Sequence, residues 1–144
     1  MRPLRCVFLM LLLALGCGDK TSSNLISVAG TVTLDGAPLA SALVTFLPHE
    51  NIKGGFATTD AAGKYQAFST GGQKGLMPGR YKVTINHCVT PDGKPSPPDV
   101  VTPGAPARET LPAQYSDMNQ TTLTANVPAS GGAIDFALKS AKKP

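Results

Sequence analysis

The sequence has no tryptophan, few charged residues and no apolar run long enough to cross a membrane. Charged residues make up only 15% of the 144 residues. Lys and Arg stand singly except for Lys142 and Lys143, whereas a strongly basic nucleic-acid-binding protein would show them in clusters. A membrane-spanning helix needs roughly 20 consecutive apolar residues, which this chain lacks. These shortages exclude a nucleic-acid partner and a multi-span membrane protein.

Glycine and proline are abundant instead, with 15 and 13 residues. Frequent breaks of this kind favour short strands and many turns, and they exclude a helical bundle. The hydrophobic share of 42% permits a core, and the net charge of +4 is too small to keep the chain unfolded. The length leaves room for one core, which excludes a multidomain enzyme.

The first 16 residues are typical of a secretory signal peptide. Arg2 and Arg5 precede a ten-residue apolar run, Cys6 to Leu15, and Gly16 follows the run. A buried core helix is the alternative, but the run shows no polar stripe. We therefore expect residues 1–16 to form a signal helix that is cleaved.

The residues Ala14-Leu15-Gly16-Cys17 resemble the lipobox of bacterial lipoproteins. The resemblance implies that the chain is cleaved before Cys17, and that Cys17 carries fatty acyl chains such as palmitate. Several acyl chains are needed for a lasting anchor, because one chain gives only marginal membrane binding. Ordinary cleavage without acylation is the alternative. Gly18 in place of an aspartate favours the outer membrane over the inner one.

Residues 17–24 are small and polar, which predicts that the lipid-bearing cysteine is joined to the domain by a flexible tether. With Cys6 removed and Cys17 acylated, Cys88 stands alone. No intramolecular disulfide is then expected, although secreted proteins commonly form them.

Residues 25–140 show the period-2 alternation of half-buried strands. Gly30 falls on the apolar face of the first segment, which predicts a bulge or a close approach. Turns are expected at Asp35–Gly36 and at residues 60–63. About seven strands and no helix after Cys17 favour an all-β, Ig-like antiparallel sandwich. The predicted strands are 26–34, 42–47, 56–59, 64–68, 80–85, 122–127 and 134–138.

Residues 88–113 interrupt this pattern. Seven of the 13 prolines lie between Pro91 and Pro112, and proline cannot donate to a central ladder. We expect a long irregular connection, extended or polyproline-like. It is either a binding loop or a solvated insertion without a partner.

Three motifs resemble the carboxypeptidase regulatory-like domain, a transthyretin-like (prealbumin-like) β-sandwich. They are residues 30–46 (GTVTLDGAPLASALVTF), 59–65 (TDAAGKY) and 77–85 (MPGRYKVTI). The stretch 111–138 is similar to the end of many short bacterial lipoproteins built on this domain. The resemblance implies the fold, and it implies little about function. A transthyretin-like hydrolase of purine breakdown ends in Tyr-Arg-Gly-Ser, which the final Ala141-Lys142-Lys143-Pro144 does not match.

A search for catalytic and metal-binding residues predicts none, and no cofactor is expected. His87 shares the parity of the core residues in its strand and is interpreted as structural. His87 and Cys88 point to opposite faces of a strand and cannot share a metal unless the strand ends there. The further candidates lack the neighbours that each kind of site requires. A catalytic serine needs a general base, a calcium site needs clustered carboxylates, and a phosphate-binding loop needs a helix after it. These candidates are His49, Ser41, Ser69, Asp35, Asp60, Asp92, Asp117 and the Gly71–Gly75 loop.

The sequence thus predicts a non-enzymatic lipoprotein of the cell envelope, attached through Cys17 and exposed to the periplasm or the cell surface. Its β-sandwich would serve as a structural or interaction module for an envelope protein or polysaccharide. A carbohydrate- or small-ligand-binding module is one alternative, although most of the three Tyr and five Phe fall on core positions. An accessory subunit of a secreted enzyme or transporter is another, and an enzyme is the third.

Overall fold

A computed structural model describes residues 24–96 and 107–141 of the chain. The predicted signal peptide (1–16), the predicted lipid-attachment residue Cys17 and nearly all of the predicted tether lie outside the described residues. They stay predictions. The described residues are almost entirely strands and turns, so the all-β prediction is confirmed.

The first sheet is built on β1 (Val28–Leu34), the first long strand of the chain. β2 (Ala37–Pro38) and β5 (Lys64–Gln66) pair with it antiparallel. β12 (Gly132–Ala133) and β13 (Phe136–Leu138) pair with it in parallel. The prediction of a purely antiparallel fold is therefore wrong for these two pairs, because the chain returns to the start of β1 before β12 begins.

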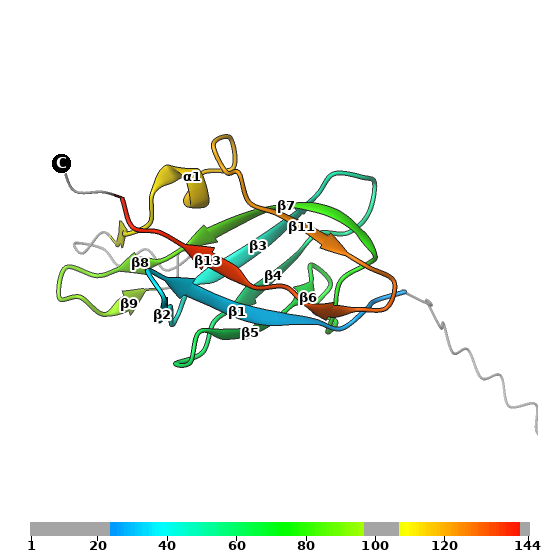
Figure 1. The fold of residues 1–144 in the computed structure, drawn as a ribbon, viewed down its shortest axis with the longest axis horizontal. Helices are drawn as coiled ribbons and strands as arrows, with labels where there is room; N and C mark the ends of the chain where they lie inside the picture. Colours follow the sequence, from blue (N-terminus) through cyan, green and yellow to red (C-terminus); the bar gives the residue numbers. More distant parts are fainter. Residues whose placement is uncertain (1–23, 97–106, 142–144) are drawn as a thin grey trace, which may run out of the picture.

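The second sheet contains five strands in the order β11-β7-β3-β4-β6, and every neighbouring pair is antiparallel. The long β3 and β7 lie at its centre and share six registered residue pairs. In Figure 1, β3 and β7 run behind β1 and β13. The strands are β3 (Leu43–Pro48), β4 (Gly55–Thr58), β6 (Phe68–Ser69), β7 (Gly79–Asn86) and β11 (Thr124–Val127).

The aromatic side chains join the two sheets in one core. The ring of Phe46 in β3 lies 6.1 Å from that of Tyr65 in β5 and 6.5 Å from that of Phe136 in β13. Tyr81 in β7 meets Phe46 edge-on at 6.1 Å. The Tyr81 hydroxyl donates to the Met77 carbonyl (2.8 Å) and the Tyr65 hydroxyl to the Ile134 carbonyl (2.5 Å). Both tyrosine rings therefore point inward, with their hydroxyls at the rim of the core.

The predicted strand 64–68 is divided between the two sheets. β5 pairs with β1, whereas β6 pairs with β4. Ala67 lies between them, fully buried, and its N–H donates to the Val28 carbonyl. Alternation alone did not reveal this change of sheet, because a strand keeps its inward and outward faces as it crosses.

Both predicted turns have the expected local chemistry. Asp35 and Gly36 have φ values of +51° and +84°, which match the left-handed conformation of a tight hairpin turn. Asp60 Oδ1 accepts hydrogen bonds from the N–H groups of Ala62 and Lys64, each at 2.9 Å. The aspartate therefore closes its own turn.

Gly30 lies where β1 contacts the segment between β12 and β13. A Cβ at this position would lie 1.9 Å from the Ile134 carbonyl oxygen, and the Ile134 N–H donates to the carbonyl of Ala29. The predicted close approach is confirmed, and its partner is the segment between β12 and β13.

We expect Gly30→Ala to lower the free energy of unfolding by about 1–3 kcal/mol, because the new methyl group overpacks the backbone of Ile134. Urea denaturation measures this change. Gly71→Ala is the control, because its Cβ would meet only the Ser69 hydroxyl at 3.8 Å, and we expect a change within about 0.5 kcal/mol. Equal losses in both variants would contradict the close-approach explanation.

Candidate interaction site

Three short strands extend the fold beyond the end of β7. They are β8 (Cys88–Val89), β9 (Pro95–Ser96) and β10 (Arg108–Glu109), in the order β10-β8-β9. We call these strands, with the Thr90–Lys94 turn, the β8–β10 platform. Figure 1 shows it at the opposite end of the molecule from the start of β1.

The platform corrects the prediction that residues 88–113 form one irregular connection. β8 and β9 lie in the first part of this segment and β10 lies in its second part. Residues 97–106 lie outside the described residues. Pro95 fits a strand because β9 pairs only with β8, so its missing N–H faces away from the ladder.

A short helix also follows the platform, although the sequence predicted no helix after Cys17. α1 (Ala113–Ser116) begins after Pro112 and buries Tyr115. At four residues it is too short for a periodic apolar pattern, which is why the alternation did not reveal it.

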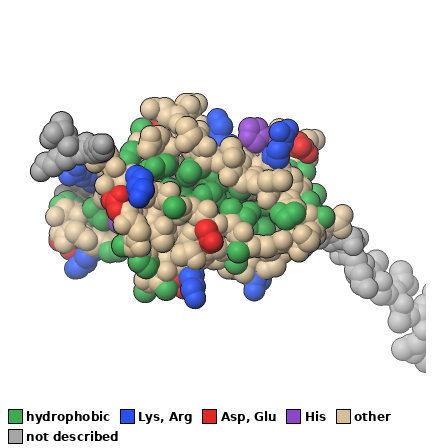
Figure 2. Space-filling view, in the orientation of Figure 1, with side chains coloured by type: hydrophobic (Ala, Val, Ile, Leu, Met, Phe, Trp, Pro, Cys, Tyr) green, Lys and Arg blue, Asp and Glu red, His purple; other side chains and the backbone are tan. Residues whose placement is uncertain are grey.

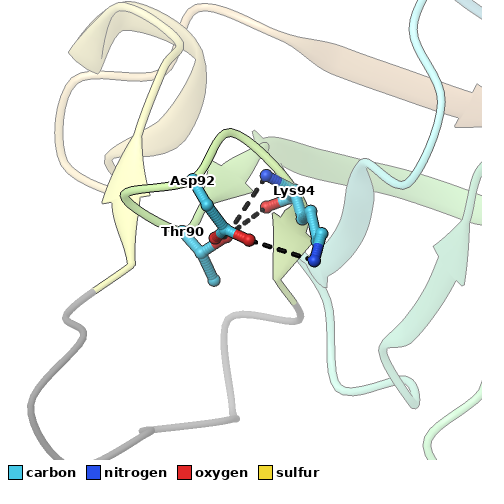
Figure 3. A network of polar contacts seen from close by, with 3 residues as sticks. All are labelled: Thr90, Asp92 and Lys94. Atoms are coloured by element: carbon cyan, nitrogen blue, oxygen red, sulfur yellow. Dashed lines mark hydrogen bonds and ion pairs between the residues drawn. The ribbon is translucent and has the colours of Figure 1, made fainter.

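The turn between β8 and β9 is held by its own side chains (Figure 3). The Thr90 hydroxyl lies 2.5 Å from Asp92 Oδ1, and the Lys94 ammonium lies 3.1 Å from Asp92 Oδ2. The Thr90 N–H donates to the Lys94 carbonyl at 2.8 Å. These hydrogen bonds, the Thr90 hydroxyl first and Lys94 second, lower the pKa of the exposed Asp92 carboxyl. The turn thus presents an ordered carboxylate and an ordered ammonium to solvent.

An open depression of about 410 Å³ lies beside this turn. Val89 and Pro91 give it apolar walls, and the exposed Arg108 of β10 supplies a guanidinium at its side. Thr90 and Gly93 complete the lining. The volume is that of a small-molecule site or of a few residues of a partner chain, and the guanidinium favours a carboxylate or a sulfate-like group.

Glu109 ties the platform to the end of β7. Its Oε1 accepts from the N–H groups of His87 (3.0 Å), Thr110 (3.0 Å) and Leu111 (2.9 Å). Its Oε2 accepts from the side-chain amide of Asn86 at 2.9 Å. Glu109 could not be predicted from the sequence, because a single carboxylate in a polar segment carries no spacing signal.

His87 and Cys88 adjoin Glu109 but do not form a nucleophile and base. The His87 ring Nδ1 lies 2.7 Å from the Thr110 hydroxyl. Burial raises the pKa of the Cys88 thiol, and the charge and hydrogen bonding of Glu109 raise it further. A catalytic cysteine needs the opposite shift. His87 is half-buried in the break between β7 and β8, which fits its predicted structural role.

The other sequence candidates lie apart from one another. Asp35 accepts from the Ser140 N–H (3.1 Å), which ties its turn to the segment after β13, and Asp117 accepts from the Asn119 N–H (2.7 Å) within its own turn. Ser69 is buried in β6, and Ser41 is exposed in a turn. His49 lines a second depression, of about 350 Å³, with Arg80 and Asn126.

Within residues 24–96 and 107–141, no three His, Cys, Asp or Glu side chains come close enough to hold a metal ion. The same residues contain no helix that is long and apolar enough to cross a membrane. Both findings concern only this part of the chain.

We expect Cys88 to react with iodoacetamide more slowly at pH 8 than an unhindered thiol, because its raised pKa leaves less thiolate. Glu109→Gln removes the carboxylate charge, so the pKa of Cys88 should fall and the rate should rise. Peptide mass spectrometry separates Cys88 from the other cysteines. Glu50→Gln is the control; a similar acceleration there would contradict a direct effect of Glu109.

Comparisons with protein-family models, with curated proteins and with solved structures find no match to this chain. The resemblance of residues 30–85 to the carboxypeptidase regulatory-like domain therefore stays a prediction.

Proposed function

We propose that this protein is a non-enzymatic envelope lipoprotein whose β-fold presents an interaction site at the β8–β10 platform. The observation that carries the proposal is the separation of the two ends of the fold. The described chain begins beside β1 at one end, and the platform with its Arg108 depression lies at the other (Figure 1). A module held at one end by Cys17 and binding a partner at the other would have this layout.

The proposed fold is a transthyretin-like sandwich of about seven principal strands. Two five-stranded sheets that share one aromatic core support this proposal. So does the order of the three sequence motifs, which fall on β1 to β3, on the turn into β5, and on β7.

The proposed partner is an acidic protein segment or an acidic polysaccharide of the envelope. Arg108 can pair with a carboxylate in bidentate geometry. Lys94 of the ordered Thr90–Lys94 turn is already paired with Asp92, so the turn adds no net charge beside Arg108. A small-ligand module is the second candidate, because both depressions fall within the volume range of small-molecule sites.

The lipid anchor is tested in the native bacterium with Cys17→Ser. We expect this variant to keep the mass of the unprocessed precursor and to lack the added acyl chains, as measured by intact mass spectrometry. Cys6→Ser is the matched control, since this residue lies in the predicted signal peptide, and it should be processed and acylated normally. An unmodified Cys17 in the wild-type protein would overturn the anchor.

The platform is tested by crosslinking capture with the full-length tagged protein. Arg108→Ala should lose most of a captured partner, roughly tenfold if the guanidinium contributes a charge-assisted pair. Lys139→Ala is the control, because Lys139 is an exposed cation whose backbone, not its side chain, contacts Tyr115. Equal capture by the wild type and both variants would show that the partner does not bind at the platform.

A further inference from the structure

Two phenylalanines are exposed side by side on the outer face of the second sheet. Phe56 in β4 and Phe68 in β6 are registered partners, and their exposed fractions are 43% and 37%. Their outward direction follows from the strand pleat, because Ala57 and Ser69 beside them are buried. The two half-exposed rings form a small apolar patch on this face.

Lysines flank this pair of rings. Lys74 forms a β-bridge with Phe68, and Lys53 lies two residues before β4. The Thr70 N–H donates to the Gly54 carbonyl, which keeps the segment of Lys53 beside the end of β6. We call Lys53, Phe56, Phe68 and Lys74 the Phe56–Phe68 corner.

Charge is unevenly distributed between the two ends of the fold. Arg80, at the start of β7, adds a third cation to the end that holds the corner, and Glu50 is the carboxylate described there. Figure 2 shows the opposite face, where Lys and Arg side chains lie at separate places around the apolar surface. Most other described carboxylates lie in the turns and strands of the opposite end: Asp35, Asp60, Asp92, Glu109 and Asp117.

The described chain enters the fold beside this corner. Ile26 exchanges two backbone hydrogen bonds with Leu76, at 2.7 and 3.0 Å, and the Gly75 N–H donates to the Ala67 carbonyl. Ile26 is therefore paired two residues from Lys74. Nine peptide steps separate Cys17 from Ile26, and a fully extended chain of that length reaches about 30 Å.

We propose that the Phe56–Phe68 corner docks on the surface of an anionic phospholipid bilayer. The phenyl rings enter the boundary between headgroups and acyl chains, and Lys53 and Lys74 face the lipid phosphates. The inference rests on the proposed anchor at Cys17, which would hold the corner close to the membrane at high effective concentration. Docking at this end leaves the β8–β10 platform at the far end accessible to a partner.

Because the chain contains no tryptophan, the fluorescence of a single introduced tryptophan reports on its own position. The full-length lipidated protein with Phe56→Trp is reconstituted into vesicles of phosphatidylethanolamine and phosphatidylglycerol whose acyl chains carry bromine, a contact quencher. Ala37→Trp is the control, because Ala37 is exposed in β2 at the far end of β1. Phe68→Trp is a second reporter if Phe56→Trp disturbs the fold.

We expect the Phe56→Trp emission to fall by about half and the Ala37→Trp emission by less than about a tenth, because quenching needs contact with the acyl region. Lys53→Glu with Lys74→Glu, or salt raised to about 0.5 M, should remove most of the difference, because charge screening shortens to a few ångströms. Vesicle sedimentation separately reports whether the protein is anchored.

The outcomes separate the two proposals. Protein that sediments with vesicles while the Phe56→Trp emission stays unquenched overturns the docking inference and leaves the anchor intact. Protein that fails to sediment overturns the anchor and the docking together. Equal quenching in neutral phosphatidylcholine vesicles overturns the role of the lysines. An emission change with soluble polygalacturonate, without quenching by vesicles, assigns the corner to an acidic polysaccharide instead.

Discussion

The contact of Phe46 with three aromatic rings is the interaction on which the rest of the fold depends. Its ring meets Tyr65 and Phe136 of the first sheet and Tyr81 of its own sheet, all within 6.5 Å between centroids. The sheets contain short strands that could not be stable alone. Packing large rings between them buries apolar area and fixes how the sheets lie on each other.

The same rings carry hydroxyls that satisfy backbone carbonyls at the edge of the core. Burial raises the pKa of Tyr65, and the nearby charge of Asp135 raises it further. The phenol therefore keeps its proton and donates to Ile134. This hydrogen bond links β5 to the segment between β12 and β13, on opposite sides of β1.

Alternation and turn chemistry were sufficient to predict that the fold is all-β and where its longer strands lie. The segments of β1, β3 and β7 follow period-2 patterns, and Asp60 closes the turn that its side chain suggested. The sheet change at Ala67 was missed because alternation reports which face is buried, not which neighbour a strand has. The parallel pairing of β13 was missed for the same reason.

The candidate site was harder to predict than the fold. Proline content correctly located an unusual segment at 88–113, but it predicted irregular structure where β8 and β10 form. Glu109 organises that end through four hydrogen bonds, two to the residues that follow it and two to Asn86 and His87, which lie 23 and 22 residues earlier. Such a role depends on where the backbone N–H groups lie, and no local pattern encodes it.

The platform continues from the end of β7, whereas the Phe56–Phe68 corner lies on β4 and β6, on the other side of β3. Their chemistry differs accordingly: ordered polar turns with most of the carboxylates at one end, and exposed rings with an excess of cations at the other. The neighbouring strands β7, β3 and β4 of one sheet join the two sites and hold them in one relative orientation. The fold would act as a rigid spacer whose two faces meet different surroundings.

The parallel pairing of β1 with β13 has a consequence for the order in which the protein folds. Val32 is registered with Phe136, so the first long strand is completed by almost the last one. Contacts between such distant residues form slowly, because the chain must close a long loop before they stabilise anything. The N-terminal sheet stays incomplete until residues 132–138 have left the ribosome. The sheet built on β1 is therefore completed only when synthesis is nearly over, whatever part of the second sheet has formed before.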